Sequence, residues 1–172
     1  NLFGFRNICR KYIGVDISQP NLTECQRMIT AEGSSCAFEQ VYLTEESPAQ
    51  IIDKVSEHID FFLSTAVFQH FPSKEYGANV LRAVRAVCKP AAVGIVQIRY
   101  DNGNEKYKPI DDIAQYHERH ITATSYGLDE FWTLLNDCGF KPLLIKNINP
   151  KVNYATFMFV AQDVGHGPRA ER

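Results

Sequence analysis

The order of short apolar runs and amphipathic segments constrains this chain more than any other feature of its sequence. Strand-like runs alternate with helix-like segments, which is typical of βαβ units and a parallel sheet. The last two runs have no helix between them, so they must pair antiparallel at one edge. The sequence therefore predicts an α/β fold with a doubly wound, mostly parallel sheet and an antiparallel C-terminal strand. The expected strands cover residues 12–17, 36–41, 59–64, 93–100, 141–146 and 153–161.

Capping residues mark the ends of two expected helices. Ser18 precedes a helix with Pro20 in its first turn, and Gly33 ends that helix. Ser73 caps a second helix, which closes before Pro90. Apolar residues at helical spacing predict the buried faces, which are Leu22, Cys25, Met28 and Ile29 in the first helix and Val80, Leu81, Val84 and Val87 in the second.

Composition limits the class of protein. The chain has 172 residues, of which 45% are hydrophobic, and we expect one domain over residues 1–162 with a disordered tail over 163–172. A formal charge of −2 gives no electrostatic sign of nucleic acid as the main partner, and no apolar run is long enough for a membrane span. Five scattered cysteines without a CxxC pair indicate reduced thiols rather than a disulfide scaffold. We therefore expect a cytoplasmic protein.

Four stretches, in this order, resemble elements of one enzyme family. Residues 12–18 (YIGVDIS) resemble the family's second strand, and residues 59–71 resemble its fourth strand with the loop that follows. Residues 80–100 resemble the next helix and the fifth strand, and residues 128–140 (LDEFWTLLNDCGF) resemble the last helix and its exit. Together these stretches resemble class I S-adenosylmethionine-dependent methyltransferases, and the resemblance covers about residues 1–161. It implies a Rossmann-like fold, S-adenosyl-L-methionine as cofactor and methyl transfer to a small-molecule acceptor.

Three departures from the family pattern have consequences. The family's first strand and glycine-rich turn would precede Leu2, and neither is present. Tyr42 stands near a place that is often acidic in the family, and residues 90–92 read Pro-Ala-Ala instead of Pro-Gly-Gly. The missing strand would lie between the strands at 12–17 and 59–64, so its omission leaves two unpaired edges and removes backbone N–H groups near the cofactor. We expect an N-terminally truncated enzyme that by itself binds cofactor poorly.

Candidate cofactor-binding residues follow the carboxyl ends of the expected strands, where open α/β sheets bind their ligands. Asp16 ends its strand, and its carboxylate can accept two hydrogen bonds from a ribose diol; alternatively, it only complements the dipole of the next helix. Ile17 either packs on the adenine or belongs to the core. The remaining candidates are Tyr42 and Leu43 beside the adenine and Ser64, Thr65 and Ala66 beside the methionine part.

Methyl transfer needs a well-placed nucleophile, and it needs a base only where the acceptor loses a proton. His70 is the candidate catalytic base, although Phe68 and Phe71 beside it equally suit a histidine that only anchors the loop. The family uses the region between the fifth strand and the last helix to shape acceptor sites. The candidates for acceptor contacts are Gln69, Arg99, Tyr100, Tyr116, His117 and His120. His117 and His120 have no clear third ligand beside them, so we expect no metal site.

Two other functions fit parts of the sequence. Another nucleotide-binding α/β enzyme, such as an NAD-dependent one, would share the acidic strand end, but the antiparallel closing strand favours a methyltransferase. A degenerate methyltransferase-like scaffold or partner subunit without catalysis fits the absent glycine-rich turn and Tyr42. Oxygen, nitrogen and carbon nucleophiles are all compatible acceptors.

Overall fold

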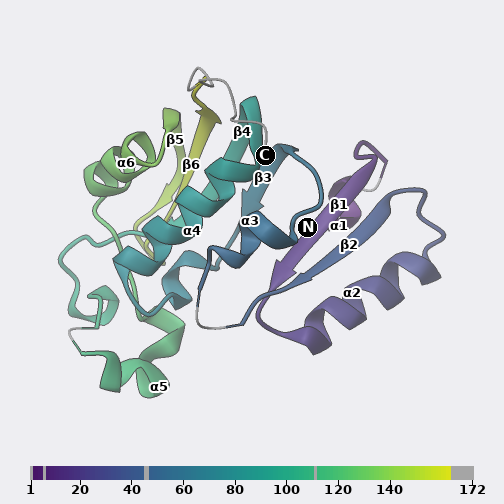
Figure 1. Cartoon of the computed structure of the whole chain (residues 1–172). Coiled ribbons are helices and arrows are strands. Elements are labelled where there is room, and N and C mark those ends of the chain that lie inside the picture. Colours follow the sequence, from purple (N-terminus) through teal and green to yellow (C-terminus); the bar gives the residue numbers. More distant parts are fainter. Residues whose placement is uncertain (1, 6, 45–46, 111, 164–172) are drawn as a thin grey trace. The chain divides into compact units, whose positions relative to one another are not determined.

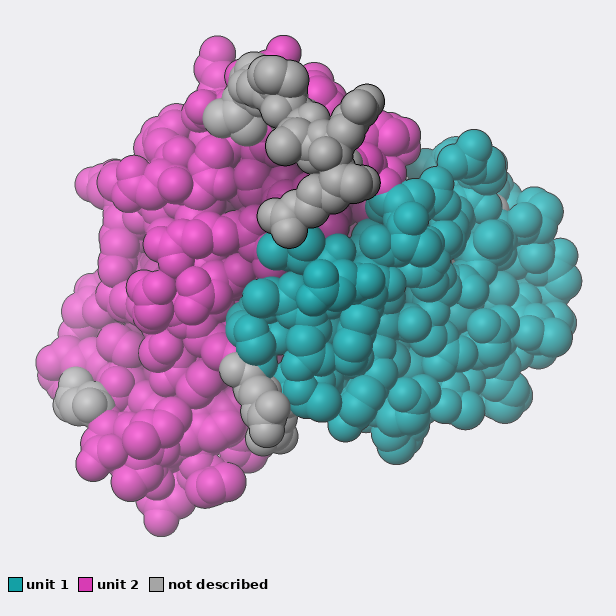
Figure 2. Space-filling view, viewed as in Figure 1, with its two compact units in different colours: residues 1–57 teal, residues 58–172 magenta. Residues whose placement is uncertain are grey.

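The chain folds into two compact units, residues 1–57 and residues 58–172 (Figures 1 and 2). The computed structural model describes residues 2–5, 7–44, 47–110 and 112–163. Nearly all of the expected disordered tail, residues 163–172, lies outside the described residues. Each unit has its own β-sheet with helices along it, so the predicted α/β class is confirmed. In the described part of the chain, no helix has the length and apolar character that crossing a membrane requires.

Unit 1 is built on a βαβ motif. Strands β1 (Lys11–Asp16) and β2 (Ala37–Tyr42) run parallel, with their first residues opposite each other and their last residues likewise. Helix α2 (Gln19–Ala31) connects them. The short helices α1 (Leu2–Phe5) and α3 (Gln50–Lys54) precede and follow this motif. The predicted strands at 12–17 and 36–41 are therefore confirmed with a shift of one residue.

Helix α2 begins and ends where the capping residues predict. The side chain of Ser18 accepts a hydrogen bond from the backbone N–H of Asn21 at 3.4 Å, and Pro20 lies in the first turn. Gly33 adopts a left-handed φ of 60° just after the helix. Both ends of the helix are therefore set by local chemistry.

The predicted buried face of α2 is only half right. Leu22 and Ile29 are buried, whereas Cys25 and Met28 are exposed. A sheet of two strands is narrow, so it covers less of a helix than the full sheet that the apolar spacing predicts. The corresponding prediction for α4 (Lys74–Val87) is confirmed, since all four of its predicted core residues are buried.

Unit 2 contains a four-stranded sheet in the order β3 (Ile59–Ser64), β4 (Cys88–Arg99), β6 (Tyr154–Ala161) and β5 (Phe140–Asn149). Strand β3 runs parallel to β4, and β6 runs antiparallel to both of its neighbours. The predicted antiparallel C-terminal strand is therefore confirmed, and it lies inside the sheet, with β5 at the edge. Among the described residues, β1 pairs only with β2 and β3 only with β4, so each has one edge without a strand partner.

Aromatic packing fixes helix α6 (Leu128–Asp137) on this sheet. Phe131 of the helix is fully buried, with its ring centroid 4.9 Å from that of Phe157 on β6 and 5.6 Å from that of Phe68. Gly94 on β4 lies opposite Phe159, and a Cβ atom at Gly94 would overlap the Phe159 ring. The position of the Phe159 ring against β4 therefore requires glycine at residue 94.

The segment between β4 and α6 is mostly irregular in its described residues, 101–110 and 112–124. It contains a 3₁₀ turn over Ile113–Gln115 followed by α5 (Tyr116–Arg119). Thr124 ties this segment to the loop after β3, because its backbone N–H donates to the Gln69 carbonyl at 3.1 Å and its hydroxyl to the Phe71 carbonyl at 2.6 Å. These bonds place the two segments together at the carboxyl end of β3.

Candidate functional site

Asp16 occupies the carboxyl end of β1, opposite Tyr42 at the end of β2. Its Oδ1 atom accepts a hydrogen bond from the backbone N–H of Ser18 at 2.8 Å, and its Oδ2 atom lies 3.5 Å from Nδ2 of Asn21. Both contacts place the carboxylate at the first turn of α2. This position fits the alternative in which Asp16 complements the dipole of that helix. A carboxylate has about four acceptor sites, so it retains capacity for the two hydroxyls of a ribose.

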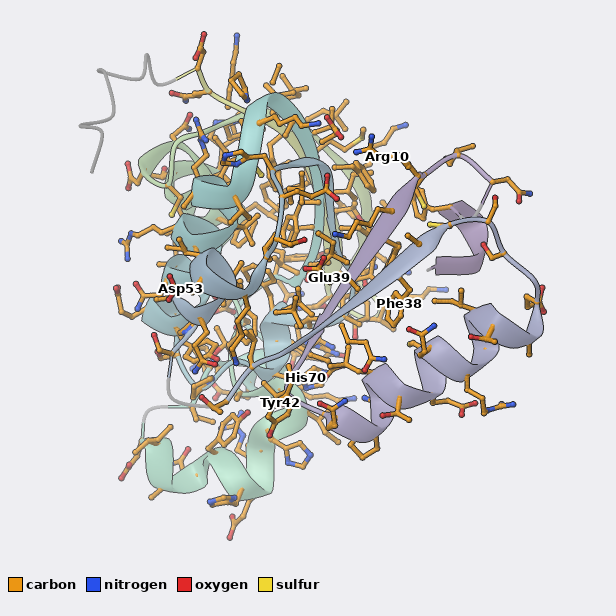
Figure 3. The ribbon with its side chains drawn as sticks, turned by 45° about the vertical axis from the view of Figure 1, so that its right-hand side comes forward. Arg10, Phe38, Glu39, Tyr42, Asp53 and His70 are labelled. Carbon is orange, nitrogen blue, oxygen red and sulfur yellow. The ribbon has the colours of Figure 1, made fainter. Side chains whose placement is uncertain are left out.

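Apolar surface flanks this carboxylate within unit 1. Ile17 is 52% exposed and Tyr42 is 42% exposed, the latter at the strand end labelled in Figure 3. The alternative that Ile17 belongs to the core is therefore wrong. Leu43 is buried, and its backbone N–H donates to the Asp16 carbonyl at 3.0 Å. A carboxylate beside two exposed apolar side chains fits an adenosine, which combines a diol with a flat apolar base.

In unit 2, the chain turns sharply after β3. Ser64 is the last residue of the strand and is buried, and Ala66 adopts a left-handed φ of 56°. This conformation is uncommon for a residue other than glycine, and Ala tolerates it better than a bulky or β-branched side chain does. The turn leads through Thr65 and Val67 to the 3₁₀ turn Phe68–His70.

A backbone carbonyl orients the imidazole of His70. The Nδ1 atom lies 2.9 Å from the carbonyl oxygen of His120, and the carbonyl can only accept. In the neutral ring, Nδ1 therefore carries the proton and Nε2 keeps its lone pair. Nε2 lies 3.5 Å from Nε2 of Gln69. Tyr116 fixes the same loop, since its hydroxyl donates to the His70 carbonyl at 2.7 Å.

Arg99 ends β4 as a buried cation. The residue is only 9% exposed, and its guanidinium lies 4.8 Å from the ring centroid of Tyr107 and 4.7 Å from that of Tyr154. It donates to the Tyr154 hydroxyl at 3.0 Å and to the Val152 carbonyl at 3.2 Å. No carboxylate within the described ranges forms an ion pair with it. Its Nε atom is buried and has no hydrogen-bond partner among the residues that the structure describes.

Gln69 links Arg99 to His70. It is 3% exposed, and its Nε2 atom donates to the Tyr154 hydroxyl at 3.0 Å. That hydroxyl therefore receives two donors, one from Arg99 and one from Gln69. The Oε1 atom of Gln69 is buried and has no hydrogen-bond partner in the described part of the chain. Buried polar atoms without partners are rare in folded proteins, and each one needs an explanation. We call this group of five residues the Arg99 cluster: Gln69, His70, Arg99, Tyr107 and Tyr154.

The structure brings together only some of the predicted acceptor contacts. Gln69 and Arg99 lie in the cluster, and Tyr116 and His120 hold its histidine. His117 is exposed. Tyr100 is buried, so its side chain belongs to the core. Its backbone N–H donates to the Asn153 carbonyl at 2.8 Å.

The sequence reasoning missed Tyr107 and Tyr154. Arg99 and Tyr154 are register partners in the β4–β6 pair. The predicted antiparallel pairing of the closing strand could therefore have indicated Tyr154 as the cross-strand neighbour of Arg99.

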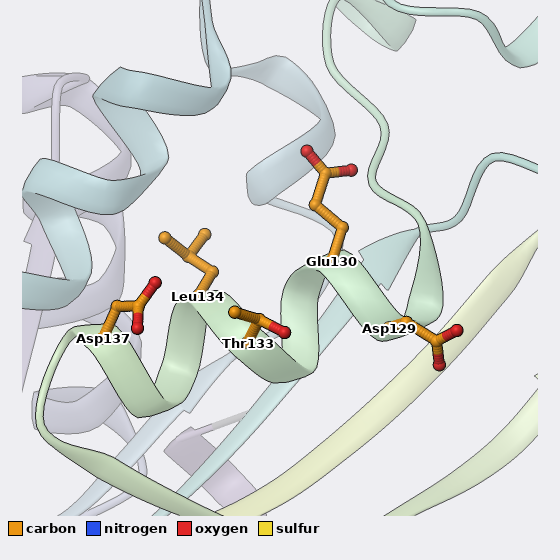
Figure 4. A pocket seen from close by; sticks show the side chains of 5 residues that line it. All are labelled: Asp129, Glu130, Thr133, Leu134 and Asp137. Carbon is orange, nitrogen blue, oxygen red and sulfur yellow. The ribbon is translucent and has the colours of Figure 1, made fainter.

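The pocket on helix α6 has simpler chemistry than the Arg99 cluster. A shallow pocket on α6 is lined by Asp129, Glu130, Thr133, Leu134 and Asp137 (Figure 4). Glu130 there is already engaged, since it pairs with Lys74 at 2.7 Å and accepts from the Gly127 N–H at 2.9 Å. Within the described ranges, no group of three His, Cys, Asp or Glu side chains is arranged to hold a metal ion.

Comparisons with known proteins support the fold. No family model matches the sequence, and no curated protein matches it. Solved structures do match. An S-adenosylmethionine-dependent methyltransferase from Clostridium acetobutylicum gives a TM-score of 0.68 at 10% identity, covering 93% of this chain and 78% of its own. An S-adenosylmethionine-dependent methyltransferase from Methanosarcina mazei gives a TM-score of 0.66 at 15% identity, covering 93% of this chain and 86% of its own.

A third match has a bound ligand of known chemistry. The 1,6-didemethyltoxoflavin N1-methyltransferase of Burkholderia thailandensis, solved with 1,6-didemethyltoxoflavin and S-adenosylhomocysteine, gives a TM-score of 0.60 at 17% identity and covers 88% of this chain and 61% of its own. At such identities the likeness establishes the fold alone. The chain therefore has the Rossmann-like fold of these methyltransferases.

Proposed function

We propose that this chain forms most of an S-adenosyl-L-methionine-dependent enzyme that methylates a small molecule. The observation that carries the proposal is the orientation of His70, whose Nδ1 faces the His120 carbonyl and whose Nε2 lies in the Arg99 cluster. In a fold shared with methyltransferases, this histidine follows the strand whose carboxyl end belongs to the ligand side of the sheet. When bound, the cofactor would supply an electrophilic methyl group on a sulfonium.

The residues of unit 1 suit the adenosine part of that cofactor. Asp16 would accept hydrogen bonds from the ribose hydroxyls, and Ile17 and Tyr42 would pack on the base. The buried Leu43 would contribute only through its backbone. In unit 2, the small residues Ser64, Thr65 and Ala66 would allow the backbone to approach the methionine part.

His70 would take up the proton that the acceptor loses. Proton uptake at Nε2 creates an N–H that faces the Gln69 amide. A half-turn of that amide would put Oε1 where Nε2 now lies, so that one oxygen accepts from both the imidazolium and the Tyr154 hydroxyl. The Nδ1–H bond to His120 persists in both protonation states. The Arg99 cluster can therefore hold either form of the base.

Arg99 and Gln69 would recognise a polar oxygen of the acceptor. The Arg99 guanidinium has five N–H donors, of which two are engaged in described bonds. A carbonyl or carboxylate oxygen would pair with this cation, which has no carboxylate partner among the residues described. Tyr116, His117 and His120 would border the same acceptor.

The family resemblance also implies a first strand with a glycine-rich turn. Strands β1 and β3 each keep an edge without a strand partner in the part of the chain that the structure describes, which supports such a strand in a longer natural protein. The 172-residue chain alone would then bind the cofactor weakly.

The test is titration of S-adenosylhomocysteine and, separately, NAD into the longest natural form of the protein, followed by a methyl-transfer assay over a panel of small acceptors. We expect saturable binding of S-adenosylhomocysteine only, and product formation with at least one acceptor. Binding of NAD in its place would overturn the proposal. Binding of neither would identify a scaffold without catalysis.

A further inference from the structure

Two thiols of unit 1 lie in contact at the start of its two strands. The Sγ atoms of Cys9 and Cys36 are 2.9 Å apart, and both residues are free cysteines. A disulfide bond needs sulfur atoms about 2.05 Å apart, so a further approach of about 0.9 Å joins them. We propose that Cys9 and Cys36 form a reversible disulfide by exchange with a low-molecular-weight disulfide such as glutathione disulfide.

The backbone brings these thiols together. Cys9 lies two residues before β1 and Cys36 immediately before β2, and the Ala37 N–H donates to the Arg10 carbonyl at 3.0 Å between them. The Cys9 N–H is bonded to the Phe5 carbonyl at 3.0 Å, and the Cys36 N–H is bonded to Oγ of Ser34 at 3.2 Å. The sulfur contact therefore follows from the parallel pairing of β1 with β2.

The two cysteines have different roles in the exchange. Cys9 is half-buried, whereas Cys36 is buried, and this burial, together with the neighbouring Cys9, raises the pKa of the Cys36 thiol to about 11. The Cys9 thiolate therefore attacks first, forming a mixed disulfide and releasing one thiol. Cys36 then attacks Sγ of Cys9 and releases the second thiol. One external disulfide is reduced to two thiols, which carry away the protons of Cys9 and Cys36.

The consequence of the bond is local stabilisation. It joins residues 27 positions apart and encloses α2 in the loop. Cross-linking a loop of this size restricts the unfolded chain, and a two-stranded sheet alone is marginal in water. Asp16 and Tyr42 lie at the opposite ends of the two strands. The disulfide therefore leaves the proposed cofactor contacts in place, and its test is independent of the proposed function.

The experiment treats the full chain with glutathione disulfide, blocks the remaining thiols with iodoacetamide, and measures intact mass and non-reducing peptide maps. We expect the loss of two hydrogen atoms, a peptide pair joined through Cys9 and Cys36, and a higher melting temperature that dithiothreitol reverses. Cys25→Ser is the matched control, since Cys25 is exposed on α2 and should leave the cross-link unchanged.

Two further variants separate the steps. Cys9→Ser should form no internal disulfide, and Cys36→Ala should retain a stable glutathione adduct on Cys9 because it lacks the second thiol. A persistent glutathione adduct on Cys9 of the unmutated chain would overturn the proposal. A cross-link through Cys25 would do the same.

Discussion

The Nδ1 atom of His70 lies 2.9 Å from the carbonyl oxygen of His120, a residue 50 positions later in the chain. This bond fixes the ring orientation and the tautomer together, because a carbonyl oxygen accepts only. It also means that His120, in the segment between β4 and α6, positions the imidazole that we propose as the base. A change in that segment should therefore alter the rate of proton transfer without removing the histidine.

Replacing His70 by Gln should lower the rate of methyl transfer about 10²–10⁴-fold for an acceptor that must lose a proton, since this is the usual contribution of a positioned base. The affinity for S-adenosylhomocysteine should remain unchanged. Comparison of turnover rates and titrations with those of His58→Gln, an exposed histidine elsewhere in unit 2, provides the control. Full turnover in the His70 variant would show that this residue only holds the loop in place.

Asp16→Asn should weaken binding of S-adenosylhomocysteine about tenfold or more, because a hydrogen bond to a charged group contributes about 1.5–3 kcal/mol. Isothermal titration measures the loss. Asp53→Asn is the matched control, because Asp53 is an exposed carboxylate of the same unit on α3 (Figure 3). Equal affinity in the two variants would mean that Asp16 serves only the N-terminus of α2.

Tyr154→Phe should destabilise unit 2 by about 1–3 kcal/mol, the usual cost of leaving buried donors without a partner. The change removes the hydroxyl that accepts from both Arg99 and Gln69. Urea unfolding measures the effect, with Tyr42→Phe as a control at an exposed tyrosine. An unchanged unfolding midpoint would show that the cluster does not depend on this hydroxyl.

The free energy of unfolding should decrease as the pH rises from about 9 to about 11. Burial raises the pKa of the Cys88 thiol to about 11, whereas the unfolded chain ionises it near pH 8.5. Between these values the unfolded state holds fewer protons than the folded state, so alkaline conditions favour unfolding. Urea midpoints across this range should depend less on pH in Cys88→Ala, whereas Cys25→Ala, at an exposed thiol, should retain the full dependence.

Much of the fold follows from local sequence. The ends of α2 and α4 follow from Ser18, Gly33 and Ser73, because capping involves residues that are neighbours along the chain. The strand at residues 59–64 is found with the predicted bounds, since a continuous apolar run between polar residues is a local signal. The antiparallel strand β6 follows from the absence of a helix before it.

The candidate site is less accessible to such reasoning. Asp16 and His70 could be proposed as candidates because each follows the carboxyl end of a parallel strand in its own unit. The stacking of Arg99 between Tyr107 and Tyr154 joins residues from β4, β6 and the irregular segment, and no local pattern relates them. The exposure of Cys25 and Met28 likewise depends on how wide a sheet the helix covers.

The sequence by itself determined the order and kind of the elements, because periodicity, capping and strand ends act over a few residues. Only the tertiary structure decided the tautomer of His70, the burial of Arg99 against two tyrosine rings and the contact of Cys9 with Cys36. Each of these depends on atoms brought together by packing and strand register across tens of residues, and spacing along the chain does not encode such distances.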